Sequence, residues 1–218
     1  MVSLHGEMLI DRLISVFLSN NPESIYIIIN EDSEILEEHL SQTDYAFPIH
    51  IVRKSTPSSL HSFYEIVKAA KDVENLCLTT TDTVFKENEF KQFISEFENN
   101  NGVDGLMAVT TFVDDESPLF VDVDASHHIT AFKDKNENQT PFISGGIYCL
   151  RKKALDLVAD SVENGTNRLR NFQRHMLDNG VKLKAHVFSK IVDVDHVADI
   201  HTAELFLREE KELQTIEN

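Results

Sequence analysis

Asp82 is the residue whose type and position most directly indicate chemistry in this chain. The stretch 76–85 reads LCLTTTDTVF, an apolar run that passes through three threonines to Asp82. Open α/β sheets bind ligands at the carboxyl ends of their strands, so a carboxylate at that point is a predicted site residue. The alternative is an N-terminal cap for a helix predicted over residues 85–97, since Asp is common at such a position.

Two further carboxylates follow an apolar strand near the end of the chain. Asp193 and Asp195 stand two residues apart, and on an extended strand this spacing places both side chains on one face. The chain contains a second D-V-D, at Asp122 and Asp124, which shows that the pattern is not unique in so acidic a protein. That pair precedes a predicted hairpin turn, where a solvated strand edge is the expected role.

Helices and strands are predicted to alternate through the first half of the chain. Apolar residues recur at helical spacing in some segments and form short continuous runs in others. Such an order requires crossover connections and therefore predicts an α/β fold with a mostly parallel sheet. The predicted elements are helix 6–17, strand 25–30, helix 35–40, strand 49–53, helix 60–70, strand 76–81, helix 85–97 and strand 106–110.

The second half of the chain has a different pattern. Residues 119–123 and 129–132 predict an antiparallel hairpin, and residues 143–150 predict a strand that contains two glycines. Helices are then predicted over 154–162 and 168–177, followed by a pair of strands ending at Val194 and a charged last helix. No linker is long enough to separate two domains, so residues 1–218 are predicted to form one domain.

Composition limits the kinds of partner and the compartment. The formal net charge of −17 repels nucleic acid and anionic lipid, so neither is an expected partner. Cys77 and Cys149 each lie in an apolar run, which predicts buried thiols rather than a disulfide or a zinc site. The chain carries no predicted signal peptide or membrane span, and the expected location is the cytoplasm.

Five segments occur in an order that is characteristic of one enzyme family. They are GEMLIDRLI (6–14), LTTTDTVF (78–85), ITAFKDK (129–135), ISGGIYCL (143–150) and KIVDVDHVADIHTAELFL (190–207). The chain thereby resembles the nucleotidyltransferases that make nucleotide sugars and related activated alcohol phosphates. The resemblance implies a three-layer fold of the nucleotide-diphospho-sugar transferase type, with helices on both faces of a mixed sheet and an antiparallel hairpin.

The resemblance also implies a reaction. A nucleotidyl group would pass from a nucleoside triphosphate to a sugar 1-phosphate or a similar phosphorylated alcohol, with release of pyrophosphate. Both reactants are anions, and a divalent metal removes their repulsion. Mg²⁺ prefers hard oxygen ligands, and the resemblance assigns it to Asp82, Asp193 and Asp195, with Asp82 and Asp193 as the catalytic residues.

Other positions match the family's substrate contacts. The loop STPSSLH (55–61) stands where the family reads the nucleobase, with Ser58 in the place of a glycine. The resemblance therefore implies nucleotide contacts at Thr56, Ser58, Ser59 and Thr81. A helix cap at Ser58 or Ser59 explains the same residues without a ligand.

Acceptor contacts are implied in the second half of the chain. Lys135 matches the family's lysine for the acceptor phosphate. Gly145 and Gly146 would let the acceptor approach the backbone, and a β-bulge is the alternative reason for glycine there. A homo-oligomer is also compatible with the resemblance.

One segment of the family pattern has no counterpart in this chain. The family's G-x-G-x-R loop, which grips the triphosphate, would precede Gly6. The sequence is therefore expected to be truncated at its N-terminus, with a native polypeptide that extends upstream of Met1. The other functions compatible with the pattern are a noncatalytic nucleotide- or sugar-binding relative and a glycosyltransferase of the same general fold.

Overall fold

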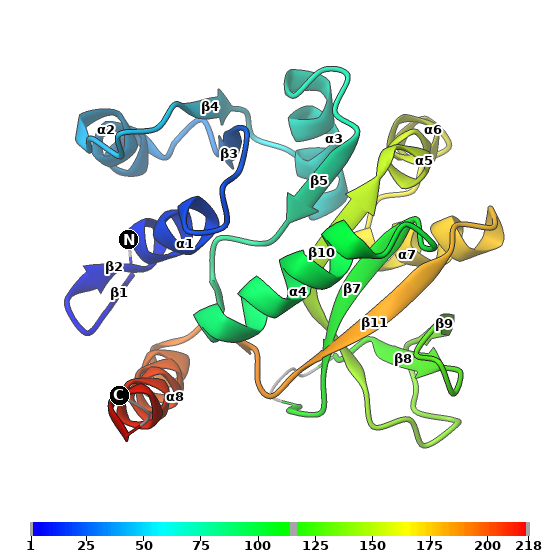
Figure 1. Ribbon diagram of the computed structural model, residues 1–218. Coiled ribbons are helices and arrows are strands. Elements are labelled where there is room, and N and C mark those ends of the chain that lie inside the picture. The colour runs from blue at the N-terminus through cyan, green and yellow to red at the C-terminus, as the bar shows by residue number, and fades with distance from the viewer. Residues whose placement is uncertain (1, 114–116, 217–218) are drawn as a thin grey trace. The chain divides into compact units, whose positions relative to one another are not determined.

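The computed structural model describes residues 2–113 and 117–216, and in the last helix it describes side chains up to residue 208. The chain divides into two compact units (Figure 1). The larger unit contains Met1–Asn20, Cys77–Cys149 and Lys182–Asn218, and the smaller unit contains Asn21–Leu76 and Leu150–Val181. Each unit is described separately below, and the single domain over 1–218 stays a prediction.

A mixed sheet forms the centre of the larger unit. Its strands are β11 (Leu183–Phe188), β7 (Gly105–Thr110), β10 (Ile143–Arg151), β8 (Phe120–Val123) and β9 (Ile129–Lys133), in that order across the sheet. β11 is parallel to β7 over six residue pairs, and β8 is antiparallel to both β9 and β10. The predicted hairpin is thus confirmed.

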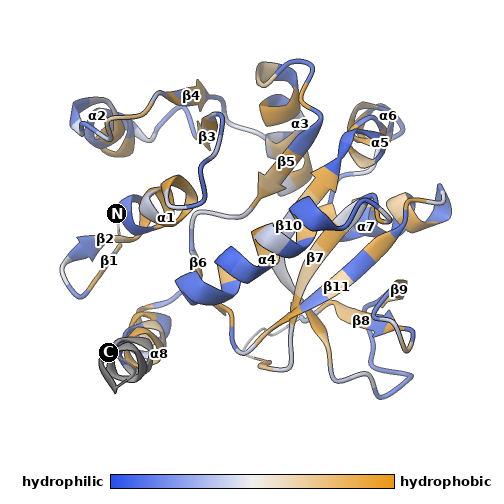
Figure 2. Ribbon diagram, in the orientation of Figure 1, coloured by the Kyte–Doolittle hydropathy of each residue, from blue (hydrophilic) through white to orange (hydrophobic). Residues whose placement is uncertain are grey.

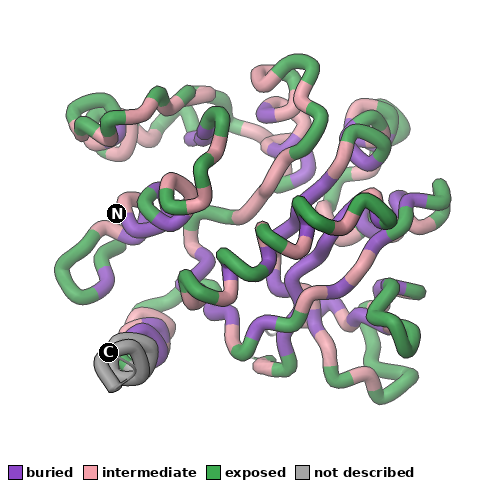
Figure 3. The backbone as a smooth tube through the Cα atoms, in the orientation of Figure 1, coloured by how far each residue is buried: buried purple, intermediate pink, exposed green. Residues whose placement is uncertain are grey.

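One further strand belongs to this sheet but has no place in the order given above. β5 (Asn75–Leu78), which enters the larger unit at Cys77, pairs with β10. All six residues of β7 are buried, as expected for a strand in the middle of a sheet (Figure 3).

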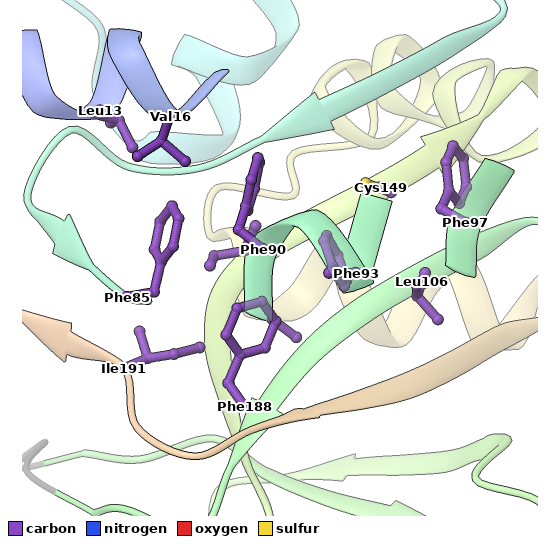
Figure 4. Close-up of a cluster of buried hydrophobic side chains, with 12 residues drawn as sticks. Leu13, Val16, Phe85, Phe90, Phe93, Phe97, Leu106, Cys149, Phe188 and Ile191 are labelled. Atoms are coloured by element: carbon purple, nitrogen blue, oxygen red, sulfur yellow. The ribbon is translucent and has the colours of Figure 1, made fainter. Parts of the chain in front are cut away.

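Helix α4 (Glu87–Asn99) covers one face of this sheet with a stripe of phenylalanines. Phe90, Phe93 and Phe97 recur at the spacing of an amphipathic helix and are buried, while most of the visible face of α4 is hydrophilic (Figure 2). The rings pack with Phe85 and Phe188, with 5.0 Å between the centroids of Phe85 and Phe90 and 5.6 Å between those of Phe93 and Phe188 (Figure 4).

The same core takes in the first helix and both cysteines. Leu13 and Val16 of α1 (Leu9–Leu18) join the phenylalanine cluster, as does the buried thiol of Cys149. Cys77 is partly buried against the cluster, and neither cysteine forms a disulfide. The prediction of buried thiols is confirmed for Cys149 and holds in part for Cys77.

A short antiparallel ribbon forms a separate two-stranded sheet in the larger unit. β6 (Thr83–Val84) pairs with β12 (Val192–Asp193), and helix α8 (Val197–Ile216) follows β12. Val84, Val192 and Val194 form a second apolar cluster with Phe206 of α8. The two strands predicted before Val194 are present, but they do not pair with each other, because β11 pairs with β7 and β12 pairs with β6.

The start of the first helix also differs from the prediction. Residues before Leu9 form a hairpin of β1 (Ser3–Leu4) and β2 (Glu7–Met8), which turns through Gly6 at a φ of +85°. The backbone of this segment is thus paired in a ladder, so the helix begins at Leu9 and not at Gly6. A φ in this region favours glycine, which has no Cβ to clash.

The smaller unit combines a two-stranded parallel sheet with helices. β3 (Ile25–Ile29) pairs with β4 (Ile49–Arg53) in parallel across five residues, both strands lie where they were predicted, and α2 (Glu34–Gln42) connects them. The other helices of this unit are α3 (Ser59–Ala69), α5 (Lys152–Leu155), α6 (Leu157–Glu163) and α7 (Leu169–Asp178). Phe63 of α3 meets Phe172 of α7 at 6.0 Å between ring centroids. The single helix predicted over 154–162 is therefore two helices separated at Asp156.

Among the helices that the structure describes, none combines the length and the apolar composition that a crossing of the bilayer requires.

Candidate functional site

Asp82 lies in the turn between β5 and β6. Its backbone carbonyl accepts a hydrogen bond from the N–H of Val194 at 3.0 Å, which ties this turn to the segment that follows β12. Helix α4 begins at Glu87, and Lys86 occupies its N-cap position. The interpretation of Asp82 as a cap for that helix is therefore wrong, because a strand separates the two.

The carboxylate of Asp82 is incompletely satisfied. The residue is half-buried, and its Oδ1 atom is buried with no hydrogen-bond partner among the described residues. Leaving a buried acceptor unpaired costs about 1–3 kcal/mol, and more for a charged group, so proteins rarely do it without a reason. A cation at this oxygen would supply the missing interaction.

The ribbon places Asp193 opposite the residue that follows Asp82. That residue is Thr83, whose hydroxyl donates a hydrogen bond to Oδ1 of Asp193 at 3.1 Å across the β6–β12 ladder. Thr83 is fully buried, whereas the carboxylate that it contacts is exposed. Sequence reasoning missed Thr83, and the only available signal was a hydroxyl residue directly after Asp82.

Asp195 follows β12 and is exposed. Val192 and Val194 are buried while Asp193 and Asp195 are exposed, the alternation expected when residues two apart share a face. The backbone N–H of Asp195 donates to Oδ2 of Asp199 at 3.1 Å, at the start of α8. The structure therefore places both aspartates on the exposed side of this segment.

The carboxylates do not form a compact metal cage. Within residues 2–113 and 117–208, no group of three or more His, Cys, Asp or Glu side chains is arranged to hold a metal ion. Mg²⁺ in phosphate-transfer sites is commonly held by one or two carboxylates, with waters and substrate phosphates as the other ligands. The unpaired oxygen of Asp82, with Asp193 on the neighbouring strand, fits that kind of site.

The two glycines of β10 have different surroundings. A Cβ added at Gly145 would lie 2.2 Å from Cδ1 of Ile191, so the side chain of Ile191 would have to move to make room for it. Gly146 has a φ of +75°, and an added Cβ would meet nothing within 4 Å. β10 continues through both residues. Packing against Ile191 therefore explains Gly145, and the open space at Gly146 leaves its backbone approachable.

Lys135 lies in the exposed loop after β9. Its carbonyl accepts a hydrogen bond from the backbone N–H of Glu137 at 2.9 Å. The neighbouring Lys133 instead forms an ion pair with Asp122 at 3.2 Å, and Asn138 donates to the same carboxylate at 2.6 Å. Asp122 is 9% exposed, so its predicted role at a solvated edge is wrong.

Asp124 shapes the turn of the same hairpin. Its carboxylate accepts hydrogen bonds from the backbone N–H groups of Ser126 and His128. The bond from His128 and then the bond from Ser126 lower the pKa of Asp124 below its ordinary value, because they favour the charged form. The second D-V-D thus has a structural explanation.

The predicted nucleobase loop belongs to the smaller unit. Ser58 occupies the N-cap position of α3, but its hydroxyl lies 2.9 Å from Nδ1 of His61 and makes no capping bond. Thr56 Oγ1 lies 2.6 Å from Oγ of Ser62, and Ser59 is exposed. Ser58 thus has the N-cap position that the alternative interpretation predicted, but it does not form the capping hydrogen bond. Thr81 belongs to the larger unit and is exposed in the turn before Asp82.

Comparison with known proteins assigns the family. Residues 1–210 match the family model described as nucleotidyl transferase. The chain belongs to the nucleotidyl transferase family. No curated protein matches this chain at a significant level.

Solved structures with the same fold share little sequence with this chain. The inositol-1-phosphate CTP transferase from T. maritima superposes with a TM-score of 0.76 at 17% identity, covering 94% of this chain and 84% of that one. A putative glucose-1-phosphate thymidylyltransferase from Bacillus anthracis gives 0.79 at 13% identity, covering 95% and 85%. The CMP:2-keto-3-deoxy-manno-octonic acid synthetase complexed with CTP gives 0.72 at 10%, covering 96% and 91%. At such identities the likeness establishes the fold, and the predicted α/β class with a mostly parallel sheet is confirmed.

Proposed function

We propose that this nucleotidyl transferase is a metal-dependent enzyme that joins a nucleoside triphosphate to a sugar 1-phosphate or a comparable phosphorylated alcohol. The observation that carries the proposal is the buried, unpaired Oδ1 of Asp82 in the turn next to the ribbon that holds Asp193. A carboxylate oxygen without a donor is suited to a cation. A cation at this place is what a reaction between two phosphate anions requires.

The phosphate oxygen of the acceptor attacks the α-phosphorus of the triphosphate. A new bond between phosphorus and oxygen forms, the bond from the α-phosphorus to the bridging oxygen breaks, and pyrophosphate leaves with the electron pair. No residue becomes covalently attached to the nucleotide. The protein contributes mainly by holding the reactants in line and by compensating their charge.

Asp82 and Asp193 would hold Mg²⁺, with Asp195 beside them on the same exposed segment. The bound metal supplies charge neutralisation between the two anions. The carboxylates keep their places because the Asp82 carbonyl accepts a hydrogen bond from Val194 and Asp193 accepts one from Thr83.

The remaining predicted contacts are divided between the two reactants. The ammonium group of Lys135 would pair with the acceptor phosphate, and the acceptor would approach the backbone at Gly146, next to Gly145. Two of the similar structures are described as acting on inositol 1-phosphate and glucose 1-phosphate, which supports a phosphorylated alcohol as the acceptor class.

Nucleotide contacts at Thr81, Thr56, Ser58 and Ser59 stay predictions from the resemblance, and Thr81 belongs to the larger unit whereas the other three belong to the smaller unit. Cytoplasmic location and a homo-oligomeric state are further parts of the proposal. They rest on the composition of the chain and on its family.

Pyrophosphate release tests the function. The full chain is incubated with each common nucleoside triphosphate, a panel of sugar 1-phosphates and inositol 1-phosphate, and Mg²⁺. We expect release with at least one pair of substrates, and loss of about 100-fold or more in Asp82→Ala, since a metal contributes several kcal/mol to stabilising the transition state. Asp124→Asn is the matched control because that carboxylate belongs to the hairpin turn.

Two results would contradict the proposal. Equal release by the wild type and by Asp82→Ala would remove Asp82 from the mechanism. Nucleotide binding without release from any pair of substrates would identify a noncatalytic member of the family.

A further inference from the structure

Two threonine hydroxyls form a chain of hydrogen bonds that ends at Asp193. Thr80 Oγ1 lies 2.6 Å from Thr83 Oγ1, and Thr83 Oγ1 lies 3.1 Å from Asp193 Oδ1. Thr83 is fully buried, whereas Thr80 and Asp193 at the two ends are exposed. A buried hydroxyl therefore connects the turn before Asp82 with the second predicted metal ligand.

The protons in this chain have a defined direction. An ionised carboxylate only accepts hydrogen bonds, so Thr83 must donate its single hydroxyl proton to Asp193. The oxygen of Thr83 then accepts in the short contact with Thr80, and Thr80 is the donor. The order is thus Thr80 to Thr83 to Asp193, and each hydroxyl donates once.

The backbone makes the central hydroxyl a fixed donor. Thr83 and Asp193 are directly opposite in the β6–β12 ladder, and such pairs project to the same face at short distance. A β-branched side chain has few χ1 rotamers, and burial of Thr83 restricts it further. An exposed aspartate without such a donor would sample several orientations.

We propose that Thr83 is a positioning residue that orients the Asp193 carboxylate for the divalent cation, and that Thr80 orders Thr83. The inference rests on the proposed function, in which Asp193 is a metal ligand. Thr83 itself does not touch the cation or the reactants. It acts through Asp193, as groups outside the ligand set of a metal commonly do.

The test compares removal of the hydroxyl with its retention. Thr83→Val replaces the hydroxyl with a methyl group of similar volume, and Thr83→Ser keeps the hydroxyl. Binding of Mn²⁺ alone to the full chain is measured from the free Mn²⁺ signal by electron paramagnetic resonance, with Asp193→Asn as a reference. We expect Thr83→Val to weaken Mn²⁺ binding on the order of 10- to 100-fold and Thr83→Ser to restore most of it.

A second variant guards against a folding defect in Thr83→Val. Thr80 is exposed, so Thr80→Val should fold, and we expect it to weaken Mn²⁺ binding in the same direction by a smaller factor. Thr130→Val, at an exposed position of β9, is the matched control and should bind Mn²⁺ like the wild type. Thermal unfolding of all variants identifies any loss of structure.

The outcomes separate this inference from the proposed function. The positioning role alone is overturned by the following result. The wild type releases pyrophosphate, Asp193→Asn loses Mn²⁺ binding, and both valine variants bind Mn²⁺ as tightly as the wild type. Absence of pyrophosphate release by the wild type overturns the proposed function, while the Mn²⁺ titration still decides the positioning role. Failure of the wild type to bind Mn²⁺ overturns the positioning role together with the metal site.

Discussion

The unpaired oxygen of Asp82 has a cost in stability and, under the proposed function, a chemical use. Residues that prepare a site for a ligand are often unfavourable until the ligand binds. Here the unfavourable atom is Oδ1 of one half-buried carboxylate. Under the proposed function, cation binding and folding therefore make opposite demands on this residue.

Replacing Asp82 should stabilise the metal-free protein. In the presence of a chelator, Asp82→Ala removes a buried acceptor that has no partner, and we expect the free energy of unfolding to rise by about 1 kcal/mol. Chemical denaturation followed by circular dichroism measures the change. A clear loss of stability would show that Asp82 is satisfied in the folded protein.

Gly145 has a steric role that extends toward Asp193. Gly145→Ala places a methyl group 2.2 Å from Cδ1 of Ile191, so Ile191 must move or the strands must separate. We expect a loss of about 1–3 kcal/mol in the free energy of unfolding, the usual cost of overpacking. Weaker Mn²⁺ binding should accompany it, because Ile191 is only two residues from Asp193.

A compensating change tests the cause of that loss. Ile191→Val removes Cδ1, so the double variant Gly145→Ala/Ile191→Val should recover much of the stability in a double-mutant cycle. If the double variant instead loses the sum of the stability losses of the two single variants, a clash with Cδ1 of Ile191 is not the cause of the loss in Gly145→Ala.

At the scale of elements, α4 is joined to β11 by charge as well as by phenylalanines. Glu96 of α4 accepts from Nζ of Lys184 at 2.8 Å and lies 2.6 Å, through its other oxygen, from Nδ1 of His186. Burial raises the pKa of Glu96, but the hydrogen bonds and charges of Lys184 and His186 oppose it and leave the pKa below the ordinary value. The cluster thus favours the ionised carboxylate in the folded state.

The sign of this shift predicts a pH dependence of stability. A carboxyl group whose pKa is lower in the folded state contributes stability above its unfolded pKa, near 4.5, and loses it as the pH falls through the folded pKa. We expect the difference in free energy of unfolding between wild type and Glu96→Gln to shrink between about pH 6 and pH 3. Glu98→Gln, exposed on the same helix, is the control, and a difference that does not change with pH would contradict the role of Glu96.

The element types were largely predictable from the sequence, since apolar periodicity is a local property. β4 agrees with its prediction to the residue, and the ends of β3, β7 and β10 agree to within one residue. Some of the errors fall where pairing between distant segments decides the outcome. β6 and β12 are only two residues each, too short for a periodic pattern, and each exists because it pairs with the other.

For the whole molecule, the net charge limits which partners can bind, and the division into two units separates the predicted site residues into two groups. A net charge of −17 argues against nucleic acid as a partner, and a site for anionic substrates in such a chain needs local positive charge from Lys135 or a cation. The predicted site residues fall in both units, with Thr56, Ser58 and Ser59 in the smaller and the carboxylates in the larger. Each group is therefore interpreted within its own unit.

The alternation of helices and strands, the place of Asp82 after an apolar strand and the resemblance to the family, which the family match confirms, all follow from the amino-acid sequence. The donation from Thr83 to an aspartate 110 residues away and the packing of Ile191 against Gly145 become visible only in the folded chain. The difference arises from the range over which the interactions act. Periodicity and turn residues act over a few positions, whereas the register between separate strands is set by packing that no local pattern encodes.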